Sequence, residues 1–216
     1  MDAPRRTYAS PLRTAQAEQT RERVLRAAAA QFAAHGYAGT SLGSIAAQAG
    51  VAVGTVKLTG AKHELLLAAF ELVFSGRESR DPIMSERSAQ ELVEATPTDQ
   101  LPELVAAVAA ELNARAATLW TAVTAAANTD DAVRQAVDDL LERRRADFRL
   151  IVAAFDDRGL VADGADRAEL AAILSFLASP EGYRQLVHES GLSPDRYKQW
   201  LARAIRQVVI DQPPAG

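Results

Sequence analysis

Residues 20–70 of this 216-residue chain decide its fold: TRERVLRAAAAQFAAHGYAGTSLGSIAAQAGVAVGTVKLTGAKHELLLAAF. In the first part of this stretch, apolar side chains recur at steps of three and four, the spacing that places them on one face of a helix. The pattern predicts a first helix over about Glu18–His35, ended by Gly36, because glycine readily takes the left-handed conformation of a helix terminus. The apolar face consists of Val24, Leu25, Ala28, Ala29 and Phe32.

Three further helices are expected next, the first two of them short. Thr40 is a candidate cap for a second helix over Ser41–Gln48, because a hydroxyl there can accept a hydrogen bond from the first turn. Gly50 closes this helix, a third spans about Val53–Leu58, and a fourth covers about 61–79. Two short helices joined by a glycine-containing turn, behind a longer helix, predict a helix-turn-helix, whose second helix enters the major groove of DNA.

The composition agrees with an all-α fold. Alanine, the strongest helix former and a poor strand former, is the most frequent residue, against 12 glycines and 9 prolines. The absence of cysteine excludes a disulfide scaffold, a thiolate zinc site, an iron–sulfur cluster and a cysteine nucleophile. No stretch approaches the roughly 20 apolar residues of a membrane span, and the N-terminus lacks the apolar region of a secretory signal. We therefore expect a cytoplasmic protein without a membrane partner.

The formal net charge of −4 is unevenly distributed. Residues 1–76 hold eight Lys or Arg and five Asp or Glu, a net +3, whereas residues 77–216 hold sixteen and twenty-three, a net −7. A basic first third on an acidic remainder indicates a small polyanion-binding head on a soluble body. The other interpretation is an accident of surface composition.

The patterns divide the chain into three parts. Residues 1–17 are polar and have no period, which predicts a flexible basic arm, either one that reaches DNA phosphates or a disordered tail. Residues 18–76 form the helix-turn-helix domain, and residues 77–216 form a second helical domain. In this second domain a proline-interrupted connector with a short helix precedes four long helices. The expected ranges are 88–95 for the short helix and 103–127, 130–158, 165–190 (bent at Pro180) and 194–210 for the long ones.

Within residues 20–70, a set of spaced positions forms an ordered pattern. It consists of the TRERVL opening, Phe32, Gly36-Tyr37, Thr40-Ser41, Ile45-Ala46, Ala49-Gly50-Val51, Gly54-Thr55-Val56, and Lys62 with Glu64-Leu65-Leu66. Over this quarter of the chain the sequence resembles the DNA-binding domain of TetR-type transcriptional regulators. The resemblance implies a homodimer whose third helices enter successive major grooves of a palindromic operator. It also implies that residues 77–216 bind a small effector, which typically releases the DNA, and supply the dimer interface.

One segment departs from the family pattern. Family members usually carry aromatic residues here, as in TLYHYFGSK, whereas residues 55–62 read TVKLTGAK, one residue shorter and without aromatics. The usual phosphate-contacting tyrosine is absent, and Ser44 stands where an acidic residue is common. The third helix is therefore a subfamily variant or is altered in its docking.

The candidate DNA contacts follow from the chemistry of phosphates and base edges. Phosphates need hydroxyl, cationic or helix N-terminal donors, while lysine can donate to guanine and apolar groups can touch the thymine methyl. We expect Val56 in the core, Thr40 to act also as an N-cap, and Lys62 to be either a contact or a solvated lysine. Phosphate contacts are expected from Arg21, Thr40, Ser41, Thr55, Lys57 and Lys62, and base contacts from Val53, Thr55, Lys57 and Leu58.

The second domain offers a candidate effector pocket and a candidate dimer interface. A cavity between helices 103–127 and 130–158 would be lined by Trp120, Val123, Phe148, Ile151 and Phe155, unless these side chains are ordinary core. The last two helices are apolar over a wide arc, which suits a four-helix interface between two copies, or a monomer in which they cover each other. The expected interface residues are Leu170, Ile173, Leu174, Leu177, Trp200, Leu201, Ile205 and Val208.

No catalytic constellation is visible in the sequence. The three histidines, His35, His63 and His188, form no metal-binding pair, and no P-loop, GxGxxG or GxSxG string occurs. We therefore expect neither an enzyme nor a cofactor or metal site. The predicted function is a sequence-specific regulator, in the first place a repressor released from a palindromic operator by a small molecule. The alternative is a helical small-molecule-binding or scaffold protein whose DNA-binding head is non-functional.

Overall fold

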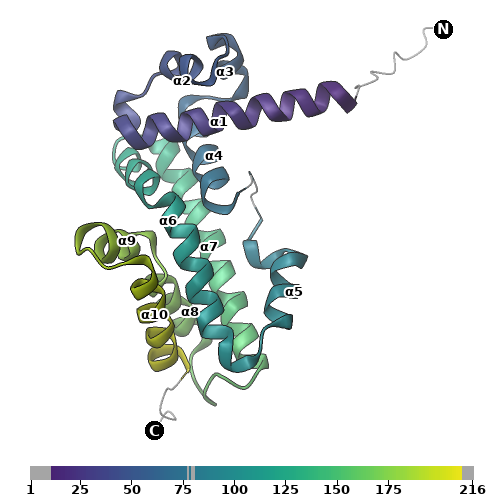
Figure 1. The fold of residues 1–216 in the computed structure, drawn as a ribbon, viewed down its shortest axis with the longest axis vertical. Helices are drawn as coiled ribbons and strands as arrows, with labels where there is room; N and C mark the ends of the chain where they lie inside the picture. The colour runs from purple at the N-terminus through teal and green to yellow at the C-terminus, as the bar shows by residue number, and fades with distance from the viewer. Residues whose placement is uncertain (1–10, 77, 79–80, 211–216) are drawn as a thin grey trace, which may run out of the picture.

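The computed structural model describes residues 11–76, 78 and 81–210. Every regular element in these residues is helical, which confirms the all-α fold class (Figure 1). A head of four helices lies at one end of an elongated molecule, and two long helices run from the head through the body. None of the described helices is both long and apolar enough to cross a membrane.

The head begins with α1 (Pro11–Gly39), in which Gly36 departs from helical geometry at φ 68° and ψ 177°. This break lies where the sequence predicts the first helix to end. The helix starts earlier than predicted, however, so residues 11–17 are helical rather than part of an arm. Proline suits a first helical turn, and residues 14–19 are exposed on all sides, so no apolar period marks them. The rest of the predicted arm, residues 1–10, lies outside the described residues.

The next head helices are α2 (Leu42–Ala49), α3 (Val53–Thr59) and α4 (Lys62–Ser75). Ser41, not Thr40, caps α2: its hydroxyl accepts from the Ser44 N–H at 3.0 Å, and the Ser44 hydroxyl accepts from the Ser41 N–H at 3.1 Å. Thr40 is instead buried and donates to the carbonyl of Gly36 at 2.8 Å. The prediction that Thr40 is the cap is wrong, because its hydroxyl already stabilises the turn after α1.

The body starts with short turns and then forms the long helices. Its first elements are η1 (Ile83–Ser85), α5 (Arg87–Ala95) and η2 (Thr98–Gln100). The two central helices are α6 (Leu101–Ala127) and α7 (Asp131–Asp157). The last part comprises α8 (Arg167–Leu177), α9 (Pro180–Tyr183) with a π-helical turn over Arg184–Glu189, and α10 (Pro194–Ile205), which continues as a π-helical turn over Arg206–Ile210.

The predicted helix 165–190 is broken rather than bent. α8 ends at Leu177, and the Ser179 hydroxyl accepts from the Gly182 N–H at 3.0 Å to start α9. Pro180 occupies the first turn of α9, where its missing N–H is not needed. The chain therefore changes direction between α8 and α9.

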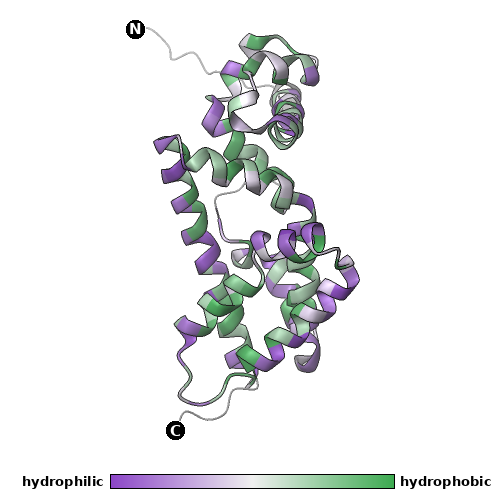
Figure 2. Cartoon of the chain, turned by 90° about the vertical axis from the view of Figure 1, so that its left-hand side faces the viewer, coloured by the Kyte–Doolittle hydropathy of each residue, from purple (hydrophilic) through white to green (hydrophobic). Residues whose placement is uncertain are grey.

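Two apolar cores share α6 and α7. The upper core joins the buried faces of α1–α4 to the head-side half of α6 and the first turns of α7, and the lower core joins the opposite halves of these helices to α8–α10. In Figure 2, apolar and polar residues alternate along the long helices, as expected for helices that bury one face. Because the upper core crosses from head to body, the two parts are packed against each other through side chains.

Candidate nucleic-acid interface and ligand cavity

The helix α3 presents an uncovered face at the tip of the head. Leu58 is 90% exposed, and Val53 and Lys57 are exposed beside it, whereas Val56 is fully buried in the upper core. The burial of Val56 confirms that it is a core residue. An almost fully exposed leucine does not stabilise a seven-residue helix. Such a surface is instead available to a partner that offers apolar groups, such as thymine methyls, beside acceptors for lysine.

The hydroxyl residues near this face differ in their availability. Ser41 is exposed at the N-terminus of α2, where free backbone N–H groups favour an anion. Thr55 is half-buried on α3. Thr40 is not accessible to DNA, because it is only 2% exposed and its hydroxyl donates to the carbonyl of Gly36. The structure therefore contradicts Thr40 as a phosphate contact and leaves Ser41 and Thr55 as candidates.

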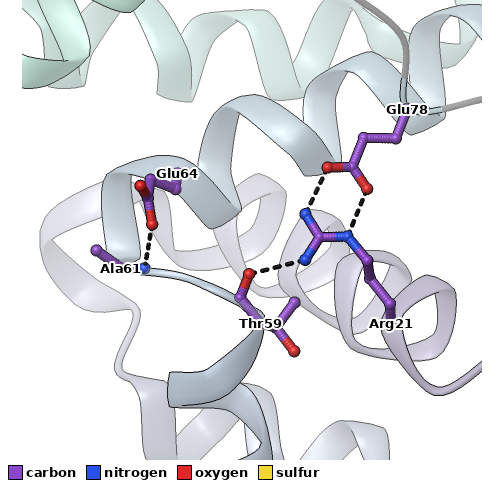
Figure 3. Close-up of polar contacts among 5 residues, drawn as sticks. All are labelled: Arg21, Thr59, Ala61, Glu64 and Glu78. Carbon is purple, nitrogen blue, oxygen red and sulfur yellow. Dashed lines mark hydrogen bonds and ion pairs between the residues drawn. The ribbon is translucent and has the colours of Figure 1, made fainter. Parts of the chain in front are cut away.

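Arg21 makes several hydrogen bonds within the protein, although its side chain is 41% exposed. Its guanidinium donates to both carboxylate oxygens of Glu78, at 2.7 and 2.5 Å, and to the carbonyl of Thr59 at 2.8 Å (Figure 3). Glu78 follows α4, and Thr59 is the last residue of α3, so one side chain ties α1 to the ends of two other helices. We call these three residues the latch. The sequence predicts Arg21 as a phosphate contact; in the structure its guanidinium is also held by these hydrogen bonds, and the phosphate contact stays a prediction.

The start of α4 is also organised by side chains of the family pattern. The Glu64 carboxylate accepts from the Ala61 N–H at 2.7 Å, which satisfies a free donor of the first turn (Figure 3). The Lys62 ammonium lies 4.5 Å from the centre of the Tyr37 ring, a cation–π distance. Lys62 is thus partly buried and held against the head, while Lys57 extends from an exposed face.

Tyr37 connects the head to the body. Its hydroxyl donates to the Asp130 carboxylate at 2.9 Å, and Asp130 also caps α7 by accepting from the N–H groups of Ala132 and Val133. Burial and this hydrogen bond raise the pKa of Tyr37 to about 12, and the same bond lowers the pKa of Asp130. The sequence marks Tyr37 as part of the family pattern and Asp130 as a helix start, but nothing in it pairs them.

A cavity of about 190 Å³ lies among α4, α5, α6, α7 and η1. Four predicted pocket residues line it, namely Trp120, Phe148, Ile151 and Phe155. Val123 does not line the cavity. It is fully buried in the upper core, about one helical turn closer to the head than Trp120. The sequence misses the wall formed by η1 and α5, because the connector has only a weak apolar pattern. Its lining residues include Ile83, Met84, Leu92 and Val93.

A few polar side chains also reach the cavity wall. Arg143 is paired with Glu71 at 2.6 Å, and the Asp147 carboxylate accepts from the Met84 N–H at 2.7 Å. Arg144 lies beside them on α7 and has no such carboxylate partner among the described residues. Within the same residues, no three His, Asp or Glu side chains gather as a metal site.

Comparisons with known proteins agree with this geometry. Residues 24–57 match the family model for bacterial regulatory proteins of the tetR family, and no curated protein matches the chain. A crystal structure from Mesorhizobium loti, assigned to TetR-family regulators, superimposes with a TM-score of 0.69 at 20% identity over 89% of this chain and 96% of its own. The chain carries a TetR-type head within the TetR-family fold.

Two further structures share this TetR fold. FadR from Bacillus subtilis, in complex with stearoyl-CoA, aligns with a TM-score of 0.67 at 17% identity, over 87% of this chain and 98% of FadR. NalD from Pseudomonas aeruginosa, the secondary repressor of the MexAB-OprM multidrug efflux pump, aligns with a TM-score of 0.67 at 19% identity, over 91% and 100%. The likeness therefore extends over nearly the whole chain, body as well as head.

In this TetR fold, the predicted dimer residues separate into two sets. Leu170, Leu174, Leu201 and Ile205 are at most 2% exposed, since they form the face by which α8 and α10 pack on the lower core. They leave no surface for a second copy, and their assignment to an interface is wrong. Ile173, Leu177 and Trp200 are partly exposed and Val208 is 38% exposed. Phe176, which the sequence pattern does not single out, is 77% exposed on α8.

Proposed function

We propose that the protein is a dimeric transcriptional repressor that binds a palindromic operator through α2 and α3 and releases it when a small molecule occupies the cavity. The observation that carries the proposal is the uncovered face of α3, with Lys57 and Leu58 exposed on a TetR-type head. A cation and an apolar tip on one short helix fit the guanine and thymine edges of the major groove. Such a regulator acts on DNA in the cytoplasm and needs no catalytic group.

Dimerisation is proposed through the outer faces of α8 and α10. Phe176 is a large aromatic side chain with most of its surface uncovered, and Val208 is 38% exposed in the π-helical turn that follows α10. A self-complementary contact between two copies would bury both and place two heads on one side of the assembly. The support is physical: when a second copy covers an exposed aromatic ring, apolar surface is removed from water, which stabilises the assembly.

The helix α4 is the proposed connection between cavity and head. Phe70 and Phe74 of α4 line the cavity, and Phe70 packs on Trp120 with ring centres 5.2 Å apart. Beyond the end of α4, Glu78 holds Arg21, which in turn holds the carbonyl that ends α3. A ligand that pushes α4 outward would therefore disturb the latch and turn the heads away from a DNA-competent spacing.

Two of the similar structures make these roles reasonable for this fold. NalD is described as a repressor, and FadR was crystallised with stearoyl-CoA. Those properties belong to those proteins, and we extend to this chain only the general arrangement of a DNA-binding head and a ligand-responsive body.

The experiment is selection of the full-length protein against random duplex DNA, followed by binding of the enriched pool at two salt concentrations. The expected result is a palindrome whose affinity falls steeply with salt, because each neutralised phosphate releases counterions. A matched variant, Lys57→Ala, should bind the recovered palindrome more weakly and with a smaller salt slope. Recovery of no sequence above background would favour the alternative of a helical ligand-binding protein with a non-functional head.

A further inference from the structure

We infer that the cavity binds a small amphipathic molecule whose anionic end group is held by Arg144 and whose apolar body lies against α5 and α6. That this molecule is the effector rests on the proposed function, whereas its binding rests on the cavity alone.

Arg144 has part of its hydrogen-bonding capacity unused. Its Nη2 donates to the carbonyls of Ser175 and Ala178, at 2.9 and 3.0 Å, and its Nε donates to the Ser175 hydroxyl at 3.3 Å. The guanidinium lies 5.1 Å from the centre of the Phe148 ring. These contacts orient the group rigidly, and Nη1, with two N–H donors, has no acceptor among the described residues.

Arg144 forms no ion pair at contact distance among the described residues, and the carboxylates of Glu181 and Asp147 only favour its charged form from farther away. Burial lowers the pKa of Arg144, the sign of a cation in a poorly hydrated place. Arg143, its neighbour, has Glu71 at 2.6 Å, whereas no described carboxylate lies within ion-pair distance of Arg144. A carboxylate, sulfate or phosphate group entering the cavity would compensate this charge, and a planar guanidinium suits such oxygens.

Asp147 lines the same wall, and its carboxylate could bind a cationic ligand instead. Its carboxylate, however, already accepts from the Met84 N–H at 2.7 Å, and burial raises its pKa, which favours the uncharged form. The two groups therefore differ: the acid is hydrogen-bonded by the backbone of η1, whereas the cation has no direct ion pair with a carboxylate of the described residues. The wall favours an anion over a cation.

The rest of the cavity suits a short apolar chain. Leu92 on α5 is 48% exposed and Val108 on α6 is 36% exposed, and both line the cavity. Its volume of about 190 Å³ is below the roughly 300–1,000 Å³ typical of pockets for drug-sized ligands. We therefore expect a medium-chain acid rather than a large conjugate.

The test is a titration of the full-length protein with three eight-carbon probes that differ only in the end group: octanoate, octan-1-ol and octylamine. Trp120 lines the cavity, so its fluorescence reports binding, with calorimetry as a second readout. Octanoate should bind at least about tenfold more tightly than the alcohol, the size expected for a charge-assisted hydrogen bond. Equal affinities, or a preference for the amine, would overturn the inference.

Three variants test whether the anionic end group binds at Arg144. Arg144→Met should abolish the preference for octanoate while the alcohol still binds, and Arg145→Met, a matched change of the exposed neighbour that pairs with Glu142, should leave it intact. Because Arg144 also holds the end of α8, thermal melting must show that Arg144→Met is folded. Val108→Trp, which adds a large side chain to the α6 wall of the cavity and leaves Arg144 in place, should block octanoate and octanol alike. Octanoate binding that survives both Arg144→Met and Val108→Trp would refute the site.

The role as effector is measured separately, by release of the selected operator on addition of octanoate. Arg144-dependent binding without release would support the ligand class and contradict its regulatory role. Release by a different molecule, with no preference for the anionic probe, would support the regulator and contradict the assignment of Arg144.

Discussion

The head and the body place their cations in opposite surroundings. Lys57 lies on an exposed face of a short helix, free to meet many positions along a polyanion, whereas Arg144 lies on a cavity wall, fixed by two carbonyls and an aromatic ring. An exposed cation gains little from any single partner in water, so it suits repeated phosphates and a salt-dependent affinity. An enclosed cation gains much from one well-placed anion. The surroundings, more than the charge, therefore decide the kind of partner.

The largest expected effect tests whether the face of α3 is as exposed as the comparison requires, by means of two leucines of the head. Leu66 on α4 is fully buried and Leu58 on α3 is 90% exposed. Leu66→Ala should lower the free energy of unfolding by about 2–5 kcal/mol, because it opens a cavity in the core that joins head and body. Leu58→Ala should change it by less than about 0.5 kcal/mol, while weakening binding to the operator. Urea unfolding measures both; equal losses of stability would show that α3 is covered in solution.

The next largest effect concerns the outer face of the body. Phe176→Asp should raise the dissociation constant of the dimer by roughly 100-fold, the scale of an aromatic hot spot, and leave the protomer folded. Sedimentation at several protein concentrations measures the change. Leu150→Asp, at an exposed leucine on α7, is the matched control and should leave the dimer intact. A dimer that tolerates Phe176→Asp would place the interface elsewhere.

A smaller effect separates the two lysines of the head. Lys57→Ala should weaken operator binding by about tenfold at low salt and reduce the salt slope by roughly one per contacted phosphate. Lys62→Ala should do less, because its ammonium is already held over the Tyr37 ring. Lys198→Ala, on α10 and close to Asp195, should have no effect. If Lys62 proved the more important of the two, the exposed face of α3 would not be the main DNA contact.

The smallest effect concerns the hydrogen bond from Tyr37 to Asp130. The raised pKa of Tyr37, about 12, means that its contribution to stability is complete below the ordinary pKa of 10 and is lost as the pH rises toward 12. The lowered pKa of Asp130 means that its contribution is present above the ordinary pKa of an aspartate and is lost as the pH falls through the lowered value.

Tyr37→Phe should therefore melt at a lower temperature than the wild type near neutral pH, and the difference should shrink at both ends of the pH range. Thermal melts of both proteins from acid to strongly alkaline pH measure this. The comparison of the two proteins isolates the hydrogen bond, because the rest of the surroundings of Asp130 is the same in both. A difference that stays constant with pH would indicate that only packing is lost.

Much of the head could be predicted because its signals are local. Gly36 breaks α1 and Gly50 ends α2, both at a positive φ that a residue without a side chain allows, and Val56 is buried at its place in the helical period. The sequence predicts the cap of α2 one residue too early, since neighbouring Thr40 and Ser41 are both good caps and only the fold shows which hydroxyl is free. The start of α1 was missed because a fully exposed helix has no apolar period.

By itself, the sequence determined that the chain is helical, where most helices begin and end, and that residues 20–70 resemble a TetR-type head. These features depend on backbone conformation and on side chains a few residues apart. Only the tertiary structure decided which apolar residues of α8 and α10 face inward, that Arg21 holds Glu78, and that Arg144 lies on a cavity wall. Each of these depends on which distant helix covers a side chain, and the helical period shows that a face is apolar without showing which element will bury it.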